Sequence, residues 1–140
     1  NMSEFNFKSQ VATSREQSEK LLSLGLKRET ADCTLFRRSK NAEWEISTDP
    51  YIDWAKEILP LELGYTHEDI IPAWSLHRLI EIVPSTINKM LWFTITPYTV
   101  LYDSVDYIKS FDSKDNLYDN IIDCIEWLIK EGHFIKAYLV

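Results

Sequence analysis

Segments with helical hydrophobic periodicity alternate along this chain with short segments rich in β-branched and aromatic residues. In order, they predict a helix, a hairpin, two helices, a second hairpin and a last helix. A chain of 140 residues fits one domain of ordinary size. We therefore expect a single α+β domain over residues 1–140, in which two β-hairpins form a small antiparallel sheet packed against three or four helices. Residues 1–12 fit a short strand or a frayed terminus equally well.

The first helix is predicted by signals at both of its ends. Thr13 and Glu16 match a capping box, with Thr13 at N-cap and Glu16 at N3. Gly25 suits the left-handed position after the helix, and Leu26 can then contact Leu21 as the apolar pair of a Schellman ending.

Three further helices have weaker but similar signals. Their expected spans are 51–59, 76–83 and 116–131. Asp49 and Pro50 suit the N-cap and N1 positions of the first of these helices. Ser75 can cap the second, and Gly132 suits the end of the third.

Two segments are predicted to be β-hairpins. The segments outside these hairpins and the predicted helices have weaker signals. In residues 33–47, a turn at Lys40-Asn41 would pair Leu35 with Ile46 and place an Arg near Trp44. Residues 90–102 predict two strands that turn around a Pro-Tyr pair. The expected assignments of the remaining segments are a connector with one helical turn near its end (61–73), a loop (103–116) and a final strand (133–140).

Charge and cysteine content restrict the class of partner and the compartment. The formal net charge of −7 argues against binding to nucleic acid, because such binding needs clustered Lys and Arg. No apolar run approaches the length of a membrane span, and the first residues lack the basic start and apolar core of a secretory leader. With only Cys33 and Cys124 present, a disulfide scaffold is not expected. We expect a cytoplasmic protein that binds neither nucleic acid nor membrane.

Catalytic signatures are few, and a structural role explains each candidate better than a catalytic role does. The chain has three glycines and no nucleophile elbow or phosphate-binding loop. His77 and Glu81 are spaced i, i+4 on one predicted helix face, as two metal ligands would be, but nothing nearby supplies a third and fourth ligand, so a solvated ion pair explains them better. A small enzyme or metal-dependent protein with a site near His67 and His77 remains the alternative function. We expect no catalytic residues, no metal and no cofactor.

The last helix presents an acidic stripe formed by Asp119, Asp123 and Glu126, since steps of four and three residues return to one side of a helix. Only Lys130 is placed to relieve their mutual repulsion. Such a stripe is either a solvated face or a docking surface for a basic protein.

The aromatic content points to an interface. Five Trp and seven Tyr are many for this length, and aromatic residues left at the surface are typical of protein interfaces. Trp92 and Trp127 are the expected exposed tryptophans. The pattern thus favours a non-enzymatic interaction protein with an acidic and aromatic surface.

Three segments, which together make up about two fifths of the chain, resemble one family. They are residues 14–32, 71–84 and 116–138, the last of which contains Glu-Trp-Leu-Ile-Lys-Glu-Gly. This pattern is similar to that of an uncharacterised family of small proteins encoded in phage-like and mobile elements of gut bacteria. The resemblance implies a bacterial cytoplasmic setting and a mobile-element origin, and it brings no catalytic residues.

Overall fold

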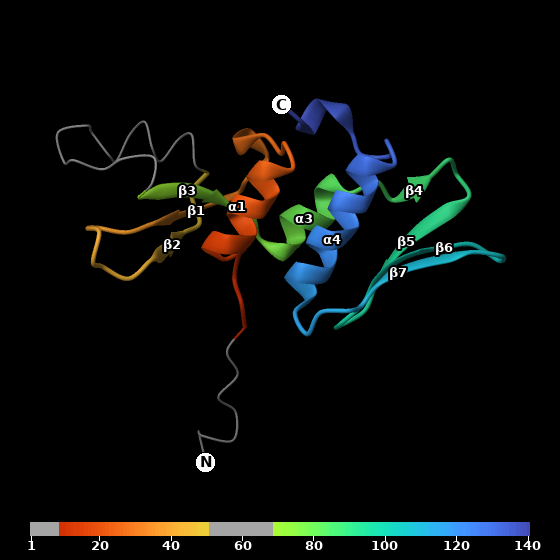
Figure 1. Cartoon of the computed structure of the whole chain (residues 1–140), viewed down its shortest axis with the longest axis horizontal. Coiled ribbons are helices and arrows are strands. Elements are labelled where there is room, and N and C mark those ends of the chain that lie inside the picture. Colours follow the sequence, from red (N-terminus) through yellow and green to blue (C-terminus); the bar gives the residue numbers. More distant parts are fainter. Residues whose placement is uncertain (1–8, 51–68) are drawn as a thin grey trace, which may run out of the picture.

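The computed structural model describes residues 9–50 and 69–140, which form an α+β structure (Figure 1). The helices are α1 (Arg15–Ser23), α3 (Leu76–Ile82) and α4 (Leu117–Lys130), with 3₁₀ turns η2 (Arg28–Thr30) and η4 (Lys136–Tyr138). The strands are β1 (Cys33–Phe36), β2 (Glu45–Ser47), β3 (Ile70–Ala73), β4 (Thr86–Ile87), β5 (Leu91–Ile95), β6 (Val100–Asp103) and β7 (Ile108–Phe111). The predicted helix at 51–59 and the histidine His67 lie outside the described residues.

The helices lie between two separate antiparallel sheets (Figure 1). The strand orders are β2-β1-β3 in the first sheet and β4-β5-β6-β7 in the second. The α+β class is confirmed, and the two predicted hairpins lie in different sheets. The larger core fills the space between the helices and the second sheet, with Trp74, Tyr102, Ile121 and Leu128 fully buried.

Local signals positioned α1 correctly to within one residue. The N-cap is Ser14 and not Thr13, because the Ser14 hydroxyl accepts from Gln17 N while the Gln17 side chain accepts from Ser14 N. Thr13 is instead buried, where its Oγ1 accepts from Trp74 N at 3.0 Å. The Schellman ending is confirmed, since Leu26 N donates to Leu21 O and Gly25 has a φ of 100°.

The first hairpin has the predicted register, and a third strand joins it. Leu35 pairs with Ile46. The Arg37 guanidinium lies 5.0 Å from the Trp44 ring centroid. The expected connector with a helical turn (61–73) is wrong over Ile70–Ala73, where strand β3 pairs with β1. Its residues 61–68 lie outside the described part of the chain. β3 tolerates Pro72 because it is at the edge of the sheet.

The second hairpin is confirmed as β5 and β6, and it is extended by a strand on each side. The expected loop at 103–116 is wrong over Ile108–Phe111, where β7 pairs with β6. On the other side, Asn88 and Lys89 both have positive φ and turn β4 into β5. The Tyr102 hydroxyl donates to Pro84 O at 2.6 Å, which fixes the end of α3 against this sheet.

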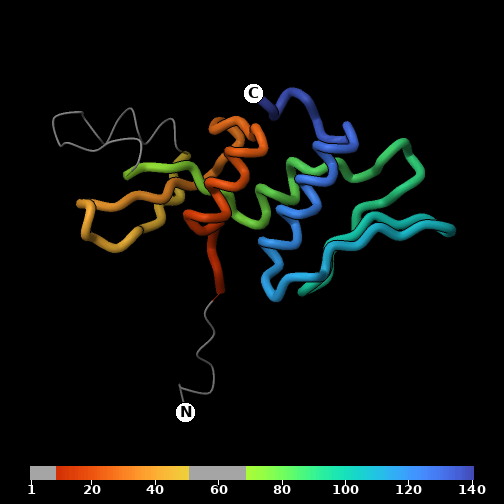
Figure 2. Tube along the Cα trace, in the orientation of Figure 1, coloured from red at the N-terminus to blue at the C-terminus, as the bar shows by residue number. Residues whose placement is uncertain are grey.

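Helix α4 and the C-terminal segment complete the core. Asn116 caps α4, and Gly132, with a φ of 76°, follows it as predicted. The predicted final strand at 133–140 is wrong: this segment contains the turn η4 and runs beside the loop after α1 (Figure 2). Lys27 N donates to Tyr138 O and Val140 N to Gly25 O, both at 2.8 Å.

Candidate functional site

The acidic stripe of α4 lies along the contact with α1. Asp119, Asp123 and Glu126 are each half-buried. Asp119 accepts from Gln17 Nε2 at 2.7 Å, and Glu126 accepts from Lys20 Nζ at 2.6 Å. Much of the stripe is therefore engaged by side chains of the same chain.

The expectation that only Lys130 relieves the repulsion among the carboxylates of the stripe is wrong. Lys20 reaches Glu126 from α1, and Lys114 Nζ lies 4.0 Å from the Asp123 carboxylate. Lys130 is 3.9 Å from Glu126. The hydrogen bond from Lys20 lowers the pKa of Glu126, which burial alone would raise. Sequence spacing within α4 cannot show these cations, because Lys20 is 106 residues away.

Trp127 is half-buried, so its predicted exposure is wrong. Its ring centroid lies 6.2 Å from that of Tyr102 and 5.8 Å from those of Phe111 and His133. Lys109 Nζ lies 6.0 Å from the same indole ring. Trp127 thus packs between α4 and β7.

Trp92 is 58% exposed, as predicted, on the outer face of the second sheet. The register places Trp92 opposite Asp103 and Asp103 opposite Ile108, so the three side chains form one row across β5, β6 and β7. Their neighbours Phe93 and Tyr102 point to the core. The outer face of this sheet thus carries large apolar side chains toward solvent.

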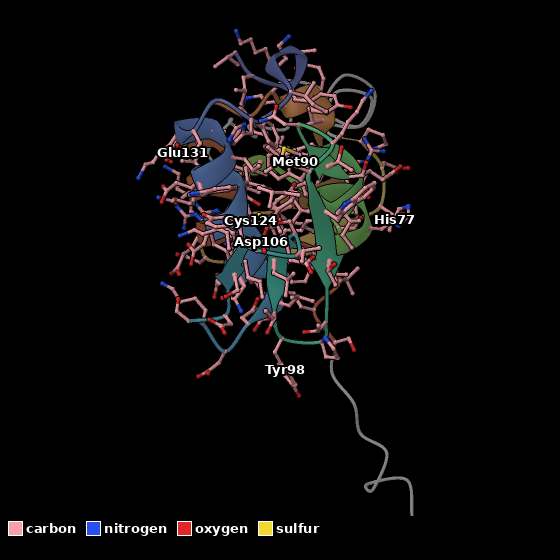
Figure 3. The ribbon with its side chains drawn as sticks, turned by 90° about the vertical axis from the view of Figure 1, so that its right-hand side faces the viewer. His77, Met90, Tyr98, Asp106, Cys124 and Glu131 are labelled. Carbon is pink, nitrogen blue, oxygen red and sulfur yellow. The ribbon has the colours of Figure 1, made fainter. Side chains whose placement is uncertain are left out.

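The row is part of a larger exposed group at one end of the sheet, which we term the apolar end. Its members are Met90, Trp92, Val105, Tyr107 and Ile108, with exposed fractions of 50% or more. Figure 3 faces this sheet, with Met90 and Asp106 near the centre of the view and Tyr98 at the opposite end of the strands.

Two carboxylates accompany the apolar end. Asp103 lies between Trp92 and Ile108 in the register, and Asp106 is in the turn between β6 and β7. The sequence assignment missed Val105, Tyr107 and Ile108 because their segment is rich in Asp and Ser. The available signal was the presence of these apolar residues among acids.

The alternative site is only partly described. The His77 side chain is 83% exposed, and its Nε2 lies 3.6 Å from Glu81 Oε1. Figure 3 shows His77 at the side of the molecule, projecting away from the core. His67 lies outside the described residues. Within residues 9–50 and 69–140, no three His, Cys, Asp or Glu side chains gather in a way that could hold a metal ion.

Both cysteines are buried and held as thiols. Burial raises the pKa of Cys33 to about 11 and that of Cys124 to about 12. Neither thiol is therefore activated as a nucleophile at neutral pH.

A cavity of about 690 Å³ lies between η2, the C-terminal half of α3 and η4. Charged side chains on its wall are Lys27, Glu29, Arg78 and Glu81. Glu81, from the predicted alternative site, thus borders a cavity that His77 does not line. This cavity could not be predicted from sequence patterns, because its three walls are distant in the chain.

No family model, curated protein or solved structure matches this chain. No helix in the described part of the chain is long and apolar enough to cross a membrane.

Proposed function

We propose that this protein is a binding module without catalytic activity of its own, which attaches to a partner protein through the apolar end of the second sheet. Its proposed setting is the bacterial cytoplasm, as part of a mobile element. The observation that carries the proposal is the gathering of five large apolar side chains, each at least half exposed, at one end of one sheet. Exposed apolar groups of this kind are typical of protein interaction sites.

The chemistry of the apolar end indicates the kind of partner. A protein surface that combines apolar side chains with Lys or Arg would cover Trp92 and Ile108 and place its cations near Asp103 and Asp106. An indole ring beside a carboxylate is also a favourable position for a guanidinium. The chain's net charge of −7 favours approach of a basic partner.

The acidic stripe supports this proposal less well than the apolar end does. Lys20 and Gln17 already engage Glu126 and Asp119, so a partner would have to displace contacts that join α1 to α4. Asp123 is the least engaged member of the stripe, since its ion pair with Lys114 has a long distance of 4.0 Å.

Retention of lysate proteins on the tagged full chain tests the proposal. We expect the wild-type protein to retain a discrete set of proteins, identified by mass spectrometry. A Trp92→Ser/Ile108→Ser variant should retain them at least about tenfold less, as loss of central interface side chains does. The matched control is Tyr98→Ser, because Tyr98 is 72% exposed at the other end of the same sheet.

The proposal fails if the double variant retains the same proteins as the wild type, or if Tyr98→Ser loses them equally. The Asp123→Lys variant distinguishes the acidic stripe from the apolar end as the binding surface. Loss of retention in this variant alone would place the working surface on the acidic stripe. All these side chains are at least partly exposed, so thermal unfolding should verify that each variant remains folded.

A further inference from the structure

The cavity between η2, α3 and η4 has a mixed lining that the proposed function does not use. Glu29 lies in η2, and Lys27 is the residue before it. Arg78 and Glu81 come from α3, and Tyr138 comes from η4. Ile82 and Tyr138 supply apolar surface. Its volume of about 690 Å³ lies within the usual range for small-molecule sites.

Hydrogen bonds between the walls hold the cavity in shape. Lys27 N donates to Tyr138 O at 2.8 Å, and Thr30 Oγ1 donates to Lys27 O at 2.7 Å. Trp74 Nε1 in turn donates to Thr30 Oγ1 at 2.9 Å. Arg78 Nη1 donates to Thr30 O at 3.2 Å, which connects α3 to the same wall. A site pre-organised in this way loses little entropy when a ligand binds.

The charged groups on the wall are incompletely paired. Among the described residues, the side chains of Lys27 and Glu29 make no hydrogen bond or ion pair. Arg78 Nε is buried and makes no hydrogen bond, although Glu81 Oε1 lies 3.3 Å away. One ammonium, one carboxylate and a partly satisfied guanidinium therefore remain for a ligand.

We infer that this cavity binds a small zwitterion of the amino-acid class with an apolar side chain. The two cations and two carboxylates of the wall sum to zero formal charge, which matches a ligand that carries one charge of each sign. The ligand's carboxylate pairs with Lys27 and Arg78, its ammonium pairs with Glu29, and its side chain contacts Ile82 and Tyr138. A simple anion that paired with Lys27 and Arg78 would bring no positive charge to the two glutamates of the wall. The cavity shares no residue with the apolar end.

Titration of the ¹⁵N-labelled full chain with L-phenylalanine tests this inference. We expect progressive NMR shifts of amides in residues 27–30, 78–82 and 137–138. 3-Phenylpropanoate lacks the ammonium, and phenethylamine lacks the carboxylate. Each analogue should bind at least about tenfold more weakly than L-phenylalanine. The first leaves the carboxylates of the wall without a cation, and the second leaves the cations of the wall without a carboxylate.

Two variants locate the site, and neither should affect folding because their positions are at least partly exposed. Lys27→Met and Glu29→Gln should each weaken L-phenylalanine binding several-fold. Lys40→Met and Glu43→Gln, exposed in the first hairpin, are the matched controls. The inference is overturned if L-phenylalanine shifts none of the cavity amides, if either analogue binds as tightly, or if both cavity variants retain wild-type affinity.

Discussion

At the scale of single residues, Leu128 defines which side of α4 faces the core. Its side chain is fully buried in the larger hydrophobic cluster, as the spacing with Ile125 predicts. Leu128→Ala should lower the free energy of unfolding by about 2–5 kcal/mol, because the truncated side chain leaves a cavity among fixed neighbours. Urea unfolding of the two proteins measures the difference.

Ile108→Ala is the control for Leu128, since Ile108 is 65% exposed in the same structure. It should change the free energy of unfolding by no more than about 0.5 kcal/mol. Equal costs for the two substitutions would contradict the packing of α4 described above.

At the scale of elements, the Lys20–Glu126 pair joins α1 to α4 across 106 residues. Lys20 lowers the pKa of Glu126 in the folded protein below its ordinary value of 4.5. The folded state therefore keeps this carboxylate charged at pH values where the unfolded chain already binds a proton. The pair's contribution to stability is full above that ordinary value and is lost as the pH falls through the lower folded pKa.

Glu126→Gln should lower the free energy of unfolding at pH 7 by at most about 1 kcal/mol, because both side chains are partly exposed. The difference from wild type should shrink as the pH falls below the ordinary value of 4.5. Urea unfolding at pH 7 and through this acidic range measures it. In a Lys20→Met background, Glu126→Gln should have a smaller effect at pH 7; an undiminished effect would show that Lys20 is not the responsible partner.

At the scale of the whole molecule, two hydrophobic clusters of unequal size hold the chain together. The larger cluster joins the three helices to the second sheet, whereas the smaller one contains Ala12, Cys33, Leu35, Ile71 and Ala73 around the first sheet. A sheet with less buried apolar surface opens at a lower free energy.

Hydrogen exchange followed by mass spectrometry should therefore show faster deuterium uptake in peptides covering β1 and β3 than in those covering α4 and β6. The expected cause is local opening of the first sheet while the larger cluster remains closed. Uptake at the same rate in both regions would indicate that the two clusters unfold as one cooperative unit.

Features with a local cause could be predicted from the amino-acid sequence alone. Gly25 and Gly132 were assigned as helix ends because a left-handed residue disfavours a Cβ, and both have positive φ. The Leu35–Ile46 register was also predicted, since alternation and turn position fix the pairing of a hairpin. The exposure of Trp92 followed from its alternation with buried neighbours.

Tertiary structure decided the features that depend on contacts between distant segments. β3 and β7 are four-residue strands within segments that were predicted to be a connector and a loop, and pairing with β1 and β6 provides their hydrogen bonds. Trp127 became half-buried because β7 brings Phe111 against it. The pairing of Glu126 with Lys20 and the cavity beside Arg78 both join segments far apart in the chain. Hydrophobic periodicity describes one element at a time, and it cannot specify which surface of another element will lie opposite.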